Sequence, residues 1–176
     1  MTLHSWDQNF KALFDRCVQA HRGGNTNQNL WYSADDKAFL GSIGCTPQEF
    51  FDFVDDHVRY SDGPSFETAL LIAAARRDYY TAVQRGKASA HRVDPTTLPA
   101  KTASVEGISW LPRLIVKARA KLCGEMDPDT MYGCGGDRAF FAQHKLHPAD
   151  FLRVVWAAGD DDKRIIDYVK TGGTWA

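Results

Sequence analysis

The fold is decided by the stretch Asp36-Lys37-Ala38-Phe39-Leu40 together with Thr46-Pro47-Gln48-Glu49-Phe50, which follows it. The pattern returns at one constant offset as Asp137-Arg138-Ala139-Phe140-Phe141 and His147-Pro148-Ala149-Asp150-Phe151. Asp, Ala, Phe, Pro and Phe are identical between the two occurrences, and Val54 and Val155 extend the match. Self-similarity at a fixed spacing is typical of duplicated structural units. We therefore predict that the chain contains two divergent copies of one repeat.

Apolar side chains in both copies recur at spacings of three and four residues, which is typical of amphipathic helices. The two apolar stripes are Trp6, Phe10, Leu13, Phe14 and Cys17 in the first copy, and Leu111, Leu114, Ile115, Ala118 and Leu122 in the second. Thr46-Pro47-Gln48-Glu49 has the residues of a capping box, with proline at the first helical position. No stretch alternates convincingly between apolar and polar residues. The prediction is an all-α protein, with two divergent helical repeats packed as a pseudo-symmetric helical bundle.

Caps and turn residues divide each copy into four expected helices. In the first copy these follow the stripe that starts at Trp6, then cover about 33–44, a segment starting at 46, and 65–85. In the second copy they start at Ser109, as N-cap, and then cover 136–145, a segment starting at 147, and 161–170. Pro95 and Pro99 lie in a polar segment between the copies, which favours a linker or crossing loop. The expected organisation is 1–85 as a degenerate first repeat, 86–107 as linker or crossing loop, and 108–176 as the second repeat.

Composition excludes several classes of protein. Lys and Arg number 21 against 22 Asp and Glu, and this near-zero net charge argues against a general nucleic-acid binder. No apolar run is long enough to cross a membrane, and the start from Met1 to Asp7 lacks the pattern of a signal peptide. The four cysteines (Cys17, Cys45, Cys123, Cys134) are scattered, which is typical of reduced thiols. We expect a cytoplasmic protein with neither a nucleic-acid nor a membrane partner.

The second half carries several separated words in a fixed order. They are Gly107-Ile108-Ser109-Trp110-Leu111-Pro112-Arg113, Lys117-Ala118-Arg119-Ala120-Lys121-Leu122, Tyr132-Gly133-Cys134 and Asp137-Arg138. This order resembles the bacterial domain-of-unknown-function family 5069, over about residues 107–169. The resemblance implies family membership and carries over neither an activity nor catalytic residues. The first half departs from the pattern, because Asn9, Leu13 and Ser33 stand where Arg113, Lys117 and Cys134 stand in the second. A chemical site is therefore expected in the second half.

Arg113 and Lys117 are the first candidate ligand-binding residues. They are four residues apart on an expected helix, so they share one face, away from the apolar stripe. Two aligned cations can hold a carboxylate or a phosphate, and arginine provides bidentate geometry. A solvated basic face with ordinary surface ion pairs is the alternative interpretation.

The most unusual word is Tyr132-Gly133-Cys134-Gly135-Gly136-Asp137. Consecutive glycines allow a ligand to approach backbone amides closely, and the helix that follows directs free N–H groups at this loop. Such a place can bind an anion and can favour the reactive thiolate form of a cysteine. Tyr132, Cys134 and Asp137 are the candidate catalytic residues, and Gly135 and Gly136 are candidate ligand-binding positions. A glycine turn with a small buried thiol is the alternative.

We predict a site for a small anionic metabolite, formed by the helix of Arg113 and Lys117 and by the Tyr132–Asp137 loop, which binds the molecule and could act on it. The rival hypothesis is a noncatalytic helical module for interaction or assembly. A divalent metal could bind to an acidic helix face made of Glu49, Asp52, Asp55, Asp56 and His57, but the sequence offers no second ligand-bearing helix, so no metal site is expected. The cofactor, the reaction and the oligomeric state stay open at this point.

Overall fold

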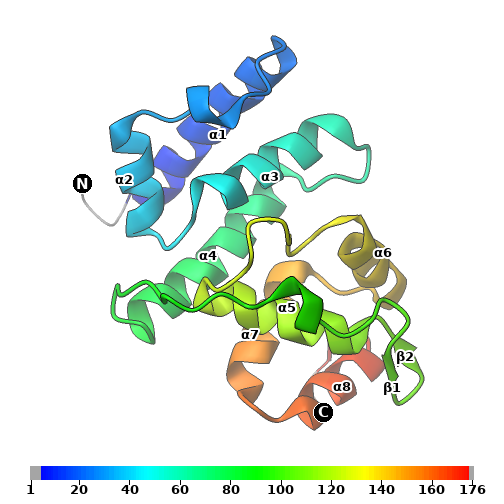
Figure 1. Cartoon of the computed structure of the whole chain (residues 1–176). Helices are drawn as coiled ribbons and strands as arrows, with labels where there is room; N and C mark the ends of the chain where they lie inside the picture. Colours follow the sequence, from blue (N-terminus) through cyan, green and yellow to red (C-terminus); the bar gives the residue numbers. More distant parts are fainter. Residues whose placement is uncertain (1–4, 175–176) are drawn as a thin grey trace. The chain divides into compact units, whose positions relative to one another are not determined.

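A computed structural model describes residues 5–174 of the chain (Figure 1). The chain start, from which the absence of a signal peptide is expected, lies largely outside the described residues. Within the described part no helix is both long and apolar enough to cross a membrane. The chain divides into two compact units, Met1–Gly86 and Lys87–Ala176. Each unit is described by itself.

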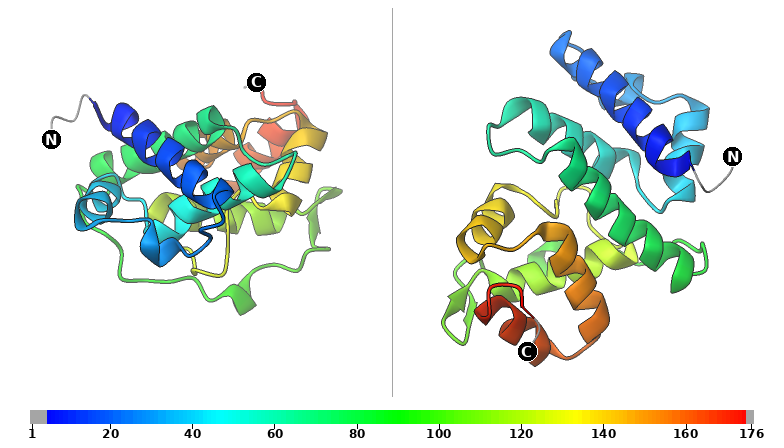
Figure 2. Two further views of the ribbon diagram at one scale, coloured as in Figure 1. Left: turned by 90° about the horizontal axis from the view of Figure 1, so that it is seen from above. Right: turned by 180° about the vertical axis from the view of Figure 1, so that it is seen from behind.

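The first unit is helical throughout its regular structure. Its elements are α1 (Trp6–Arg22), the 3₁₀ turn η2 (Gln28–Leu30), α2 (Ala34–Ser42), α3 (Pro47–Arg59) and α4 (Phe66–Ala82). Helix α1 packs against α3 and α4 (Figure 2), because its apolar stripe supplies Phe10 and Phe14 to the centre of the unit. Phe50 of α3 meets both rings edge to face, at centroid distances of 5.0 and 6.2 Å. These aromatic contacts lie within the core of the first unit, which also contains buried aliphatic side chains such as Leu40, Val54 and Ile72.

Side-chain caps explain where two helices of the first unit begin. Ser33 and Asp36 form a capping box at the start of α2, and Thr46 and Glu49 form one at the start of α3. In each box the hydroxyl accepts the N–H of the acidic residue, whose carboxylate accepts the N–H of the cap residue. The capping box predicted at Thr46, with Pro47 in the first turn, is confirmed.

The second unit has four α-helices and a small hairpin among its described residues. Its elements are the 3₁₀ turn η3 (Pro95–Thr97), β1 (Ser104–Val105), β2 (Ile108–Ser109), α5 (Leu111–Cys123), α6 (Gly135–His144), α7 (Pro148–Ala158) and α8 (Asp162–Lys170). Helix α5 packs against α7, and α7 packs against α8, as Figures 1 and 2 show. Leu114, Phe151 and Ile165 are fully buried and fill the space between these three helices. The prediction of a mostly helical fold is thus confirmed.

The expectation that no strand occurs is wrong at one place. Strands β1 and β2 pair antiparallel, with Ser104 opposite Ser109 and Val105 opposite Ile108. Glu106 and Gly107 turn the chain with positive φ angles of 49° and 81°, the pattern of a tight hairpin turn. Strands of two residues are too short to produce a visible alternation in the sequence.

The hairpin also corrects the predicted start of α5. Ser109 lies in β2 and is not the N-cap; that position belongs to Trp110, whose φ is +71°. The left-handed region costs a residue with a Cβ about 1–2 kcal/mol, so the surrounding contacts must hold this tryptophan in place. Its backbone N–H donates to the carbonyl of Ala103, which ties the entry of α5 to the hairpin.

Residues 87–107 belong to the second compact unit. The Val93 N–H donates to the carbonyl of Glu125, and the Ser89 hydroxyl donates to the Glu125 carboxylate. The Leu98 side chain is buried, although the segment is polar overall. The segment therefore runs along the end of α5 and is anchored there.

Candidate functional site

A buried ion pair joins α5 to the start of α6. The Lys117 ammonium lies 2.5 Å from Oδ2 of Asp137, and the two side chains are only 3% and 0% exposed. Removing two charges from water is costly, and their attraction offsets that cost only when the remaining hydrogen-bonding capacity is also satisfied. The other hydrogen-bond partners of Lys117 and Asp137 therefore decide whether the buried pair is stable.

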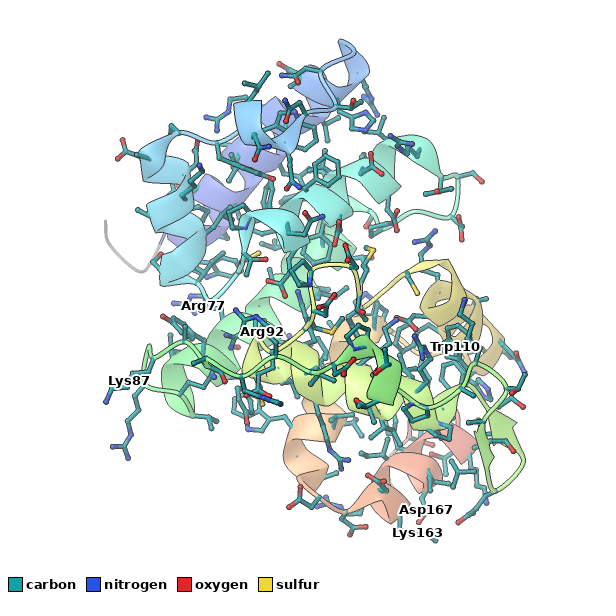
Figure 3. The ribbon with its side chains drawn as sticks, viewed as in Figure 1. Arg77, Lys87, Arg92, Trp110, Lys163 and Asp167 are labelled. Atoms are coloured by element: carbon teal, nitrogen blue, oxygen red, sulfur yellow. The ribbon has the colours of Figure 1, made fainter. Side chains whose placement is uncertain are left out.

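The Asp137 carboxylate is fully engaged. Oδ1 accepts the indole N–H of Trp110 at 2.9 Å, and Oδ2 accepts the backbone N–H of Gly133 at 2.9 Å as well as the Lys117 ammonium. The two oxygens thus have separate partners, which fixes the plane of the carboxylate. Trp110, labelled in Figure 3, lies beside α6.

Cys134 is the N-cap of α6 and completes the cluster. Lys117 Nζ donates to its sulfur at 3.3 Å, so one ammonium contacts both the thiol and the Asp137 carboxylate. Cys134 makes no side-chain hydrogen bond to the first turn of α6, and its side chain is half-buried. We name the four residues Trp110, Lys117, Cys134 and Asp137 the thiol cluster.

The glycines around Cys134 have different roles. Gly133 adopts φ +90°, which favours glycine. A Cβ on Gly136 would lie 2.3 Å from the Trp110 ring, so only glycine lets the indole come this close. Gly135 is exposed, and a Cβ there would meet only the Arg138 guanidinium, at 3.7 Å. The open side of the loop therefore has a cation next to it.

Arg113 and Lys117, the two candidate ligand-binding residues of α5, have different hydrogen-bond partners. Lys117 contacts Cys134 in the glycine loop, and because its side chain is buried it does not lie on a solvated basic face. The Arg113 guanidinium donates to the carbonyl of Pro99 at 2.8 Å, so it fastens the segment before the hairpin. A spacing of four residues places both on one side of the helix, but α6 covers only the part around Lys117.

Tyr132 has a structural role. Its hydroxyl donates to the carbonyl of Pro148 at 2.8 Å, and its side chain is 3% exposed. Burial, and after it the negative charge of Asp137, hold the pKa of Tyr132 well above its usual value. The phenol therefore stays protonated and fastens the loop to the start of α7.

Two histidines near the loop have structural partners. The His144 ring stacks on Phe140, with ring centroids 4.4 Å apart. His147 is the N-cap of α7 and accepts the N–H of Ala149. No contact of either ring to Cys134 is found in the described part of the chain.

A thiol beside an ammonium that is oriented by a carboxylate can act as a nucleophile. The positive charge stabilises the thiolate, and the third group holds the amine in position. The start of α6 adds backbone N–H groups and the positive end of the helix dipole. The sequence reasoning missed Trp110 and Arg138 as members of this site. Arg138 could have been proposed from the sequence, because it directly follows Asp137. Trp110 could not, because the sequence does not indicate its left-handed backbone.

The acidic face of α3 is occupied by protein partners. Asp55 accepts from Arg59 Nε at 2.7 Å and lies 2.7 Å from His21 Nε2. Among residues 5–174 no group of three or more His, Cys, Asp or Glu side chains is arranged to hold a metal ion.

Residues 96–175 match the model of a protein family described as Domain of unknown function (DUF5069). The match lies in the second half of the chain, as the resemblance predicted. Comparisons with curated proteins and with solved structures found no match.

Proposed function

We propose that the second unit binds a small anionic molecule at the start of α6, and that Cys134 attacks this molecule as a nucleophile. The observation that carries the proposal is the double contact of Lys117, with the Cys134 sulfur at 3.3 Å and the Asp137 carboxylate at 2.5 Å. The ammonium stabilises the thiolate, whose electron pair forms the S–C bond to an electrophilic carbon of the molecule while the leaving group departs with the electron pair of the bond that breaks.

The first unit supports the proposal by contrast. At the start of α2, Ser33 and Asp36 form a capping box, and Asp36 pairs with Arg16, whose side chain is 55% exposed. A hydroxyl cap and a solvent-exposed ion pair are therefore sufficient to stabilise the N-terminus of α2. The second unit buries an ion pair at the corresponding place, which is expensive in desolvation, and puts a thiol where the hydroxyl stands. Helix capping alone does not explain that arrangement.

The anion would be held on the open side of the loop. Gly135 exposes the first turn of α6, where the positive end of the helix dipole favours negative charge. The Arg138 guanidinium donates through Nη1 to the carbonyl of Gly133, and its Nη2 lies next to this position, where it can donate to a carboxylate or phosphate. Lys117 and Arg138 would then be the cations of the site, with Arg113 supporting it through Pro99.

The test compares two reagents that differ in charge. Iodoacetate is a small carboxylate with an electrophilic carbon, and iodoacetamide is its neutral analogue. The rate ratio of iodoacetate to iodoacetamide at Cys134, measured by timed labelling and peptide mapping, should exceed the ratio for glutathione by about tenfold, the scale of a charged hydrogen bond. The iodoacetate rate should also saturate, and inorganic phosphate should compete with it.

Matched variants locate the effect. Arg138→Gln should lower the ratio, whereas Arg153→Gln, which removes an exposed arginine on α7, should leave it unchanged. A ratio at Cys134 equal to that of glutathione, without saturation, contradicts the proposal.

We also propose that the two units are copies of one repeat. The Tyr32 hydroxyl donates to the carbonyl of Pro47 at 3.0 Å, and the Tyr132 hydroxyl donates to that of Pro148 at 2.8 Å. Each tyrosine precedes a short helix, and each proline lies in the first turn of the next. Experimental coordinates in which 36–54 and 137–155 superpose would support the duplication, and unrelated crossing angles would contradict it.

A noncatalytic interaction role is the second candidate, and it concerns the first unit. The four large hydrophobic side chains that are exposed among the described residues all lie there: Leu30, Tyr60, Leu71 and Val83. Light scattering of the full chain tests this role, since assembly that is lost in Leu30→Ser would favour it.

A further inference from the structure

We infer that Trp110 is the positioning residue of the thiol cluster: its indole N–H fixes the Asp137 carboxylate, and the carboxylate holds the Lys117 ammonium against Cys134. The inference rests on the proposed function of the site. The indole N–H donates to Asp137, and the Cys134 sulfur accepts from Lys117, so Trp110 acts through Asp137.

The backbone of Trp110 suggests that its side chain matters. Its φ of +71° is a conformation that glycine adopts freely and that a bulky residue rarely adopts. A glycine would make the same turn between β2 and α5 without strain. An outlier of this kind persists only where the surrounding contacts determine it, and such outliers cluster at functional sites.

Contacts of the indole fix its position closely. The ring lies against the backbone of Gly136, where an added Cβ would be 2.3 Å from Cζ2 and 2.5 Å from Cη2. The indole N–H points to Asp137 Oδ1, at 2.9 Å. The next residue along α6 from Gly136 is Asp137, so one segment supplies both the surface for the ring and the acceptor for its N–H.

The hydrogen bond from Trp110 orients the Asp137 carboxylate because the two carboxylate oxygens have different partners. Oδ1 is held by Trp110, which leaves Oδ2 for Lys117 and for the Gly133 N–H. Without the indole donor, Oδ1 would be buried and unsatisfied, and the carboxylate would gain by rotating to find another partner. Lys117 would follow its counter-ion, and the 3.3 Å contact with Cys134 would lengthen.

The first experiment removes only the donor. Trp110→Phe keeps an aromatic ring against Gly136 and lacks the N–H. The pH–rate profile of Cys134 alkylation by iodoacetamide should move to higher pH by about one unit, with about a tenfold lower rate near neutral pH, the scale of one charged hydrogen bond. The charged or titratable groups in and next to the contacts of this thiol are Lys117, Asp137, Arg138 and Tyr132.

Trp31→Phe is the matched control. The Trp31 indole also donates one hydrogen bond, to the carbonyl of Asn25 at 2.9 Å, and lies in the first unit. Its loss should lower the melting temperature without moving the Cys134 profile. A purely structural Trp110 would behave in the same way, so an unmoved profile in a folded Trp110→Phe protein overturns the inference.

A second measurement uses the unaltered chain and covers the case in which Trp110→Phe does not fold. The indole N–H resonance of Trp110, assigned by triple-resonance NMR, should shift with pH at the midpoint of Cys134 alkylation. Cys134→Ser should abolish that inflection, and the Trp31 resonance should lack it. A Trp110 resonance that does not respond at this midpoint also overturns the inference.

The outcomes separate this inference from the proposed function. If the wild-type Cys134 reacts no faster than glutathione and Lys117→Met changes nothing, the proposed function fails. If Cys134 is reactive and depends on Lys117, but the profile of Trp110→Phe is unmoved, only the role of Trp110 fails.

Discussion

Trp110 and Gly136 touch each other so closely that the indole occupies the place of a side chain: a Cβ on Gly136 would lie 2.3 Å from the ring. The contact joins the N-cap of α5 to the first turn of α6, 26 positions along the chain from Trp110 to Gly136 (136 − 110). Packing this tight leaves no room for relaxation by the flexible end of a side chain, because both partners are rigid.

Gly136→Ala should therefore destabilise the protein by about 1–3 kcal/mol, the usual range for overpacking a well-filled site. Gly135→Ala is the control, since a Cβ there meets only the Arg138 guanidinium at 3.7 Å. Alanine at that helical position should be neutral or stabilising by about 0.5–1 kcal/mol. Urea unfolding measures both, and equal effects of the two changes would show that the indole is not where we place it.

Cys134→Ser should raise the free energy of unfolding by about 0.5–1 kcal/mol, because serine at an N-cap accepts a first-turn N–H that the thiol does not accept. Ser33 already makes this bond in the first unit, so Ser33→Ala should cost about 0.5–2 kcal/mol. Denaturant titration gives both values. A destabilised Cys134→Ser protein would mean that the packing of the sulfur and its contact with Lys117 outweigh the hydrogen bond gained at the N-cap.

Lys117→Met should cost about 3–5 kcal/mol, because it leaves the Asp137 carboxylate buried without its counter-ion. Arg16→Met removes the cation from the ion pair of Asp36 in the first unit, where the arginine is 55% exposed, and should cost only about 0–1 kcal/mol. The double variant Lys117→Met with Asp137→Asn should recover part of the loss. Chemical unfolding that finds similar costs at Lys117 and Arg16 would contradict a dry ion pair.

The protein should lose stability in alkaline solution. Burial, which outweighs the charge of Arg16, raises the pKa of the Cys17 thiol from 9.0 to about 11, and burial likewise raises the pKa of Tyr132. Between pH 9 and 11 the unfolded thiol releases its proton while the folded one keeps it, so the free energy of unfolding falls as pH rises through this window. Melting curves from pH 7 to 11 test this, and Cys17→Ala should flatten the decline between pH 9 and 11.

Sequence periodicity and capping predicted the helices because both act over a few residues. The stripe from Phe10 to Cys17 and the box at Thr46 are local patterns, and the structure has helices at both. The hairpin was not predicted because each of its strands has only two residues, too few to show an alternating pattern. The position of Trp110 was not predicted for a different reason. Its left-handed backbone is stabilised by a ring contact with α6, and nothing in the neighbouring sequence indicates that contact.

For the candidate site, the sequence indicated a loop and a helix that the structure brings into contact, but not which side chains meet there. The helical period placed Lys117 outside the apolar stripe, which is true of α5 in isolation. Its burial results from Asp137 and Cys134, which lie 20 and 17 positions further along the chain. Arg113, one turn earlier, finds the carbonyl of Pro99 instead, so two similar residues have different surroundings.

The boundary between the compact units falls at Gly86 and Lys87, so each unit is built from one uninterrupted stretch of chain. Synthesis proceeds from the N-terminus, and domains generally fold as units. All the residues of the first core, from Phe10 to Ala75, therefore emerge from the ribosome before any residue of the thiol cluster. The residues that form the aromatic core of the first unit are therefore all present in the nascent chain before Cys134 is added.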